Sequence, residues 1–171
     1  MKLQTYLAEI GRFLKPHRTI PKTPWTATSR WSVNLKNLPI LFFGLAIFGI
    51  GDALLIQSTI GNSPWSVFAQ GLSLRTPLSV GEATAITSIA VLLLWIPLKE
   101  RPGFGTLANI ALIAVFIQIG VDHIPKIEMN ILLQILYVLI GIGLVGMGSA
   151  LYITCGLGPG PRDGLMTSIH N

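Results

Sequence analysis

The sequence contains four long apolar stretches, and their length constrains the fold more than any other feature. A membrane-spanning helix needs about 20 predominantly apolar residues (range about 17–25), and each stretch is long enough. Inside lipid, only helices and closed barrels satisfy all of their backbone polar groups. We therefore predict an all-α membrane protein in contact with the lipid bilayer, with four transmembrane helices at about residues 38–60, 80–98, 104–121 and 131–157.

The composition agrees with a location in the membrane. Hydrophobic residues make up 51% of the chain and charged residues only 11%, whereas soluble domains carry about 25% charged residues. The net charge of +5 is not accompanied by interleaved aromatic residues, so a nucleic-acid partner is not expected. The one cysteine, Cys155, lies in an apolar run, which excludes a disulfide framework.

Residues 64–74 form a shorter apolar segment between the first two predicted spans. The segment is too short to cross the bilayer, and it is typical of a re-entrant or interfacial helix.

Residues 1–37 form a basic leader that holds seven of the twelve Lys and Arg residues. Apolar residues between Leu3 and Leu14 recur at helical spacing, which predicts an amphipathic helix on the membrane surface. A surface for another protein is the alternative reading of this helix.

The distribution of basic residues orients the predicted spans. With the leader in the cytoplasm, ten Lys and Arg residues lie on the cytoplasmic side, and only Arg75 and Lys126 lie outside. This distribution follows the positive-inside rule. We expect a bacterial plasma (inner) membrane protein with a cytoplasmic N-terminus.

Residues 44–72 and 141–169 are two copies of one segment, offset by 97 positions without a gap. One period contains three spans, an odd number, so the fourth span must cross in the direction opposite to the first. The copies are therefore predicted to be an inverted repeat, an arrangement typical of transporters. Five of the eight identical pairs are Gly or Pro, as the full set shows: Gly44/Gly141, Gly49/Gly146, Gly51/Gly148, Ala53/Ala150, Leu54/Leu151, Ile56/Ile153, Gly61/Gly158 and Pro64/Pro161.

The repeat divides the chain into three parts. After the leader, residues 38–130 form a first repeat of three spans, and residues 131–171 start a second repeat with one span and a re-entrant turn. The second copy has no counterparts of the second and third spans, so we expect a C-terminally truncated form of an inverted-repeat architecture.

Small residues predict how the first and fourth spans pack. Ala46, Gly49 and Ala53 form a stripe on the first span, and the corresponding stripe on the fourth span is Gly143, Gly146 and Ala150. Small residues let helix backbones approach closely in a membrane. We expect these two faces to pack against each other or against a common neighbour.

Asp52 is the one acidic residue deep within a predicted span. A buried carboxylate costs about 2.5–3.5 kcal/mol on insertion scales, so it usually has a partner or a function. Asp52 is a candidate proton or cation site, or else a carboxylate bonded to a neighbouring helix. Asn109 and Gln118 either line a polar path or bond another helix.

The two segments that follow the first and fourth spans share their turn residues but not their chemistry. Gly61 and Pro64 in the first copy correspond to Gly158 and Pro161 in the second. In the second copy, Gly160 and Pro161 are typical of an N-cap and a first helical residue, with Asp163 in the first turn. Arg162 beside a helix N-terminus indicates an anion contact or a gate, or else it only fixes the topology. The candidate ligand or ion residues are Asp52, Asn109, Arg162 and Asp163.

Other polar residues have structural interpretations. Ser79 and Glu82 match a capping box at the start of the second span. The acidic and histidine residues at 122–128 match no metal-ligand spacing. No nucleophile–base pair or phosphate-binding loop is present. We therefore expect no metal, no cofactor and no enzymatic activity.

The motifs resemble those of the YczE/YyaS/YitT family of bacterial integral membrane proteins, and the YczE branch most. The resemblance covers residues 38–169 and is most specific in the motif from Gly156 to Met166. It also rests on the segment Gly61–Trp65 and on Trp95, Gly105 and Asn109. It implies a polytopic membrane protein, with members longer at the C-terminus, and it supplies no substrate.

Two functions follow as hypotheses. The first is a small-solute transporter or permease with a midplane site near the Pro64 and Pro161 turns, possible homo-oligomer formation and an unknown small solute. The second is an accessory or scaffold protein that regulates a membrane-associated enzyme or biosynthetic complex.

Overall fold

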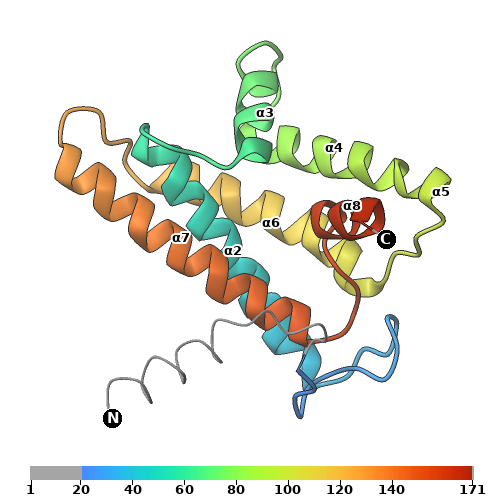
Figure 1. Cartoon of the computed structure of the whole chain (residues 1–171). Helices are drawn as coiled ribbons and strands as arrows, with labels where there is room; N and C mark the ends of the chain where they lie inside the picture. Colours follow the sequence, from blue (N-terminus) through green and yellow to red (C-terminus); the bar gives the residue numbers. More distant parts are fainter. Residues whose placement is uncertain (1–20, 171) are drawn as a thin grey trace, which may run out of the picture.

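The computed structural model describes residues 21–170, and the amphipathic helix predicted near the N-terminus lies outside them. This part of the chain contains helices and no strands (Figure 1). The elements are α2 (Asn37–Ser58), α3 (Pro64–Ser73), α4 (Val80–Leu93), α5 (Trp95–Leu98), α6 (Phe104–His123), α7 (Ile131–Thr154) and α8 (Pro161–His170). The predicted all-α fold class is confirmed.

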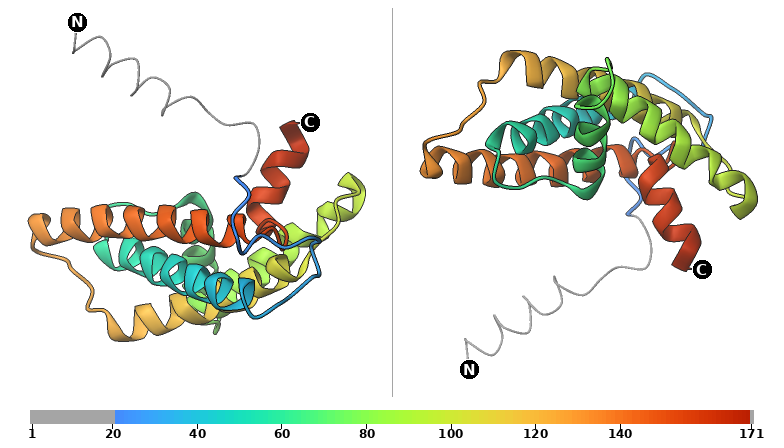
Figure 2. Two further views of the ribbon diagram at one scale, coloured as in Figure 1. Left: turned by 90° about the horizontal axis from the view of Figure 1, so that it is seen from below. Right: turned by 90° about the horizontal axis from the view of Figure 1, so that it is seen from above.

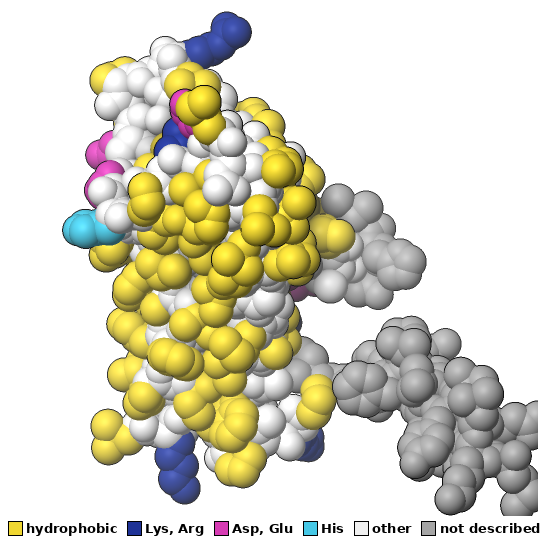
Figure 3. Space-filling model, turned by 90° about the vertical axis from the view of Figure 1, so that its left-hand side faces the viewer, with side chains coloured by type: hydrophobic (Ala, Val, Ile, Leu, Met, Phe, Trp, Pro, Cys, Tyr) yellow, Lys and Arg dark blue, Asp and Glu magenta, His cyan; other side chains and the backbone are white. Residues whose placement is uncertain are grey.

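Four segments are long and apolar enough to cross a membrane: α2, α4 together with α5, α6 and α7. They contain 22, 19, 20 and 24 residues, and their positions match the four predicted spans. Figure 3 shows one face of the molecule, on which hydrophobic side chains predominate and charged side chains are few. The short apolar segment forms α3, whose 10 residues are too few to cross.

The helices α4 and α8 begin at the residues that the sequence predicts. Ser79 and Glu82 form the predicted capping box of α4. Gln118 on α6 accepts a hydrogen bond from the backbone N–H of Gly81 at 3.0 Å, so it bonds another helix rather than lining a polar path. Pro161 is the first residue of α8, as predicted, and Asp163 lies in its first turn.

α2 lies between α7 and α6, a layering that both views of Figure 2 show. Four glycines allow the close approach of α2 and α7. A Cβ added at Gly148 would lie 2.6 Å from the Gly44 carbonyl oxygen, and one at Gly141 would lie 2.9 Å from the Gly51 carbonyl oxygen. The two helices are antiparallel, because Gly44 pairs with the later of the two α7 glycines.

The predicted packing of the first and fourth spans is therefore correct, but the predicted faces are wrong. On α2, Gly49 faces α6, where an added Cβ would lie 2.6 Å from the Phe116 Cβ. On α7, a Cβ at Gly143 or Gly146 would meet no atom within 4 Å. Glycines two positions apart point about 200° apart on a helix, which explains why Gly49 and Gly51 contact different neighbours.

One predicted turn glycine has no steric role. A Cβ at Gly61 would meet nothing within 4 Å, and Thr59, with φ of 64°, supplies the left-handed residue that ends α2. In the second copy the left-handed residues are Gly156 and Gly158, with φ of 67° and 107°.

Candidate functional site

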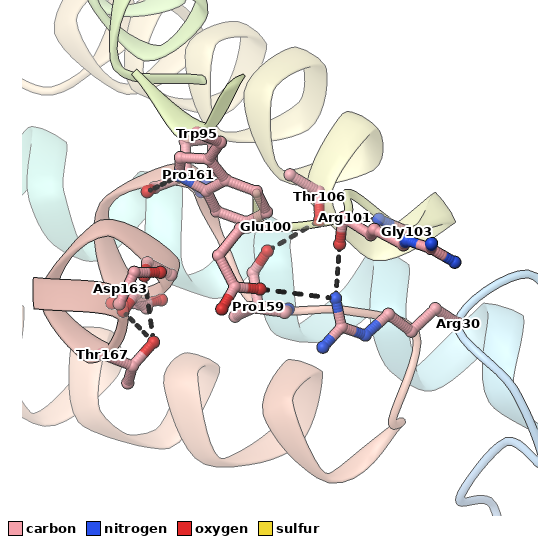
Figure 4. Close-up of polar contacts among 12 residues, drawn as sticks. Arg30, Trp95, Glu100, Arg101, Gly103, Thr106, Pro159, Pro161, Asp163 and Thr167 are labelled. Atoms are coloured by element: carbon pink, nitrogen blue, oxygen red, sulfur yellow. Dashed lines mark hydrogen bonds and ion pairs between the residues drawn. The ribbon is translucent and has the colours of Figure 1, made fainter. Parts of the chain in front are cut away.

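The turn between α7 and α8 is fixed to the start of α6. The backbone N–H of Gly105 donates to the Leu157 carbonyl oxygen at 2.8 Å. The Thr106 hydroxyl donates to the Pro159 carbonyl oxygen at 2.8 Å, as Figure 4 shows. The Trp95 indole N–H donates to the Pro161 carbonyl oxygen at 3.0 Å, drawn in the same view. These three bonds place the N-terminus of α8 inside the bundle.

Arg162, at the second position of α8, faces the start of α3. Its guanidinium carbon lies 5.8 Å from the centre of the Trp65 ring, within the range of a cation–π interaction. Its Nη2 atom is buried and has no hydrogen-bond partner among the described residues. No acidic group of residues 21–170 lies within 4.0 Å of the guanidinium. A buried guanidinium donor without a partner is costly, and it is available to a ligand.

Asp52 lies in α2 with only 2% of its surface exposed. The hydroxyl of Ser66, on α3, donates to the Asp52 carboxylate at 2.8 Å. Asp52 and Arg162 attract each other electrostatically without forming an ion pair. Asp52 and Arg162 are therefore near each other without direct contact. A small ligand could bind to both groups, or a proton could move to or from Asp52.

A small enclosed cavity lies beside Arg162. Its volume is about 20 Å³, enough for one water molecule. Its polar lining comes from four helices: Ser88, Asn109, Tyr152, Arg162 and Asp163.

Two further contacts shape this cavity. The Tyr152 hydroxyl on α7 donates a hydrogen bond to the Asp163 carboxylate. Gly160 leaves room for Asn109, because an added Cβ would lie 2.8 Å from the Asn109 Nδ2 atom. The Asn109 amide makes no hydrogen bond within the part of the chain that the structure describes, so its donors and acceptor are free for a molecule in the cavity.

Three of the four candidate residues from the sequence, Asn109, Arg162 and Asp163, line this cavity. Asp52 does not line it, but it is close enough to Arg162 for an electrostatic attraction. Sequence reasoning did not identify Trp65, Ser66 or Tyr152. A usable signal was present, since Asp52 and Ser66 have the same spacing as Ser149 and Asp163 in the second copy, with acid and hydroxyl exchanged.

Asp122 and His123 are the last two residues of α6, and Glu128 lies in the loop that follows. All three are exposed, and no cluster of three or more possible metal-binding side chains occurs in residues 21–170. The site thus consists of one cation, two carboxylates, hydroxyls and an amide, enclosed by helices.

Four membrane-length helices around this enclosed polar site define a polytopic α-helical membrane protein. Residues 35–171 match the model of the "Family of unknown function (DUF6198)", and the chain belongs to that family. The resemblance to YczE and YyaS that the motifs indicate is confirmed by the relatives below.

Three relatives are similar to the chain. An "Uncharacterized protein" of Haemophilus influenzae is 46% identical over 155 residues, which cover 91% of this chain and 71% of the relative. The "Uncharacterized membrane protein YczE" of Bacillus subtilis is 34% identical over 142 residues, 82% of this chain and 62% of the relative. The "Uncharacterized protein YyaS" of the same organism is 32% identical over 136 residues, 75% of this chain and 65% of the relative. The chain thus spans about two thirds of the length of these relatives. No solved structure matches the chain.

Proposed function

We propose that this protein is a small-solute transporter of the bacterial plasma membrane, with its solute site between the N-termini of α3 and α8. The observation that carries the proposal is the contact of Arg162 with Trp65, at 5.8 Å, beside the buried Asp52. The N-termini of α3 and α8 thus lie next to each other. Discontinuous helices whose N-termini meet at a site are a recurring feature of secondary transporters.

Arg162 and the two helix N-termini favour a solute with a negative charge, and the carboxylates of Asp52 and Asp163 offset part of this attraction. The N-terminus of each short helix contributes a partial positive charge of roughly half an elementary charge. Arg162 adds a full positive charge with one buried and unpaired nitrogen. Asp52 lies close enough to offset this charge while the site is empty, and its protonation would strengthen the attraction for an anion. Asp52 is therefore the ion-coupling candidate of the proposal.

An inverted repeat is part of this proposal, and reciprocal contacts support it. Under a two-fold axis in the membrane plane, each residue of the first copy is equivalent to the residue 97 positions later. A contact between Gly44 and Gly148 then requires an equivalent contact between Gly141 and Gly51. Both contacts occur, at 2.6 and 2.9 Å from an added Cβ. Trp65 and Arg162 are likewise 97 positions apart and contact each other. Equivalent residues that meet each other are expected near such an axis.

The cavity of about 20 Å³ is too small for a solute other than water. In the proposal, this closed arrangement alternates with states in which the two halves separate on one side of the membrane. The excess of basic residues near the leader supports a cytoplasmic N-terminus. The proposal assigns no enzymatic reaction, cofactor or nucleic acid to the chain.

Anion flux through proteoliposomes tests the proposal. Vesicles containing a pH-sensitive dye would be exposed to gradients of chloride, nitrate, formate, acetate and phosphate, with protein-free vesicles as the baseline. We expect at least one anion to enter faster with the protein present. Replacing the charge in Arg162→Gln removes an interaction of about 1.5–3 kcal/mol, a loss of roughly 10–100-fold in flux.

Three further variants sharpen this test. Arg162→Lys keeps the charge and is expected to retain part of the flux. Asp52→Asn is expected to uncouple anion entry from proton movement. Arg75→Gln removes an exposed arginine that does not line the cavity and is expected to leave the flux unchanged. If no anion enters above the baseline, or if Arg162→Gln equals Arg75→Gln, the transporter proposal is wrong and the accessory role becomes the better hypothesis.

A further inference from the structure

The outward face of α7 has no protein neighbour in the described residues, although it carries a stripe of small residues. A Cβ at Gly143 or Gly146 would meet no atom within 4 Å, and Ala150 is exposed. In the most apolar window of α7 only 17% of the residues are buried, against 50% for α2. Figure 2 shows α7 as an outer layer, with α2 on its inner side.

The corresponding face of α2 is covered by α6. Gly49, the counterpart of Gly146, would carry a Cβ only 2.6 Å from the Phe116 Cβ and 3.1 Å from the Ile113 carbonyl oxygen. Ala53, the counterpart of Ala150, contacts Gly120. Residue numbers rise together along the two helices, so α2 and α6 are parallel.

We propose that the face formed by Gly143, Gly146 and Ala150 is the docking surface for one further transmembrane helix, which packs on α7 as α6 packs on α2. This inference rests on the inverted repeat of the proposed function. The docked helix runs parallel to α7, with a bulky side chain over Gly146 and a small residue beside Ala150.

A helix fits this face better than lipid does. A glycine inside a helix costs about 0.5–1 kcal/mol relative to alanine, and lipid chains gain nothing from its absent side chain. Close packing of another backbone does gain from it, because helices in membranes associate through small residues. In α2 the identical residue at the identical position serves this contact. The three relatives are longer than their matched parts, so each has residues available to supply such a helix.

A tandem extension of the full chain tests the proposal with a defined helix. Residues 75–130 are appended after Asn171, which places a second α4 and α6 in register with the 97-residue offset. In a Cys155→Ala background, cysteines replace Gly146 and the appended copy of Phe116. We expect oxidation to join these two cysteines within one polypeptide.

Two controls make either outcome interpretable. Gly49→Cys with the original Phe116→Cys is expected to crosslink in the same protein, which reports that the first copy has folded. Met147→Cys is half exposed but points about 100° away from Gly146, and it is expected to crosslink at least 10-fold less. If the Gly49 pair crosslinks while the Gly146 pair does not, or if Met147 crosslinks as well as Gly146, the proposal is overturned.

The Haemophilus influenzae relative gives an independent test. A photo-crosslinking amino acid at the residue aligned with Gly146 is expected to react with a transmembrane helix of the same polypeptide beyond the matched region. Reaction with lipid alone, or with a second copy of the protein, would contradict the proposal. The anion flux of the 171-residue chain does not depend on these results, so failure here is distinguishable from failure of the transporter proposal.

Discussion

Alanine at Gly148 should destabilise the protein, whereas alanine at Gly146 should not. Both glycines lie in α7, two positions apart, and both gain the same methyl group. At Gly148 the new Cβ would lie 2.6 Å from the Gly44 carbonyl oxygen and 2.9 Å from the Phe48 backbone nitrogen and Cβ. At Gly146 it would meet nothing within 4 Å.

The magnitude follows from the displacement that the methyl group requires. Ordinary van der Waals contact begins at about 3.4 Å, so α2 and α7 must separate by roughly 0.8 Å from the 2.6 Å contact. Overpacking of this kind costs typically about 1–3 kcal/mol. Both variants also gain up to about 1 kcal/mol of helix propensity. The propensity gain cancels in the comparison, so the difference between the two variants should be about 1–3 kcal/mol.

Reversible unfolding in mixed micelles of a mild detergent and dodecyl sulfate measures this difference. The unfolded fraction is followed by circular dichroism, and the free energies of unfolding are compared at one detergent ratio. Gly148→Ala should unfold at a lower dodecyl sulfate fraction than the wild type, and Gly146→Ala at the same or a higher fraction. Equal free energies for the two variants, within about 0.5 kcal/mol, would refute the assignment of the α2–α7 interface.

Three other outcomes follow from single contacts. Ser79→Ala removes the side chain that caps α4 and should cost about 1 kcal/mol in the same unfolding assay; no change would contradict the cap. Gly160→Ala places a Cβ 2.8 Å from the Asn109 Nδ2 atom and should lower the melting temperature, whereas Gly61→Ala, in open space, should not. Burial raises the pKa of the Cys155 thiol from 9.0 to about 11, so alkylation at pH 8 should be about 100-fold slower than in the unfolded chain; equal rates would refute its burial.

The spans could be predicted because each depends on one local property, the length of an apolar run. The capping box at Ser79 and the start of α8 at Pro161 were also predictable, since both are set by residues a few positions apart. The packing faces of α2 and α7 were not. Each helix carries small residues on opposite sides, and spacing alone does not say which side meets which neighbour. Identity between the copies does not decide this either, since Gly49 and Gly146 are as identical as the pairs Gly44/Gly141 and Gly51/Gly148 that form the contact.

The candidate site could be predicted in part for a similar reason. Asp52 and Arg162 stand out because charges are rare in an apolar chain, and the structure brings both to one place. Ser66 and Tyr152 are unremarkable in sequence, and their contacts depend on where α3 and α8 lie relative to the long helices. The turn before α8 is fixed by backbone bonds such as Gly105 to Leu157, 52 positions apart, which no local pattern reveals.

The proposed two-fold relation also gives a reason why the two copies share glycines but differ in chemistry. Near such an axis, a residue contacts either its own counterpart, 97 positions away, or a residue whose counterpart makes the equivalent contact. Glycine can occupy both positions of such a pair, because two helix backbones can then approach closely. Two arginines at positions 65 and 162 would repel each other in a low-dielectric site, so a cation at one position requires a compatible neighbour at the other. Trp65 is such a neighbour, since its ring attracts a cation. The asymmetry at the centre of the bundle is therefore what a charged site on a symmetric scaffold requires.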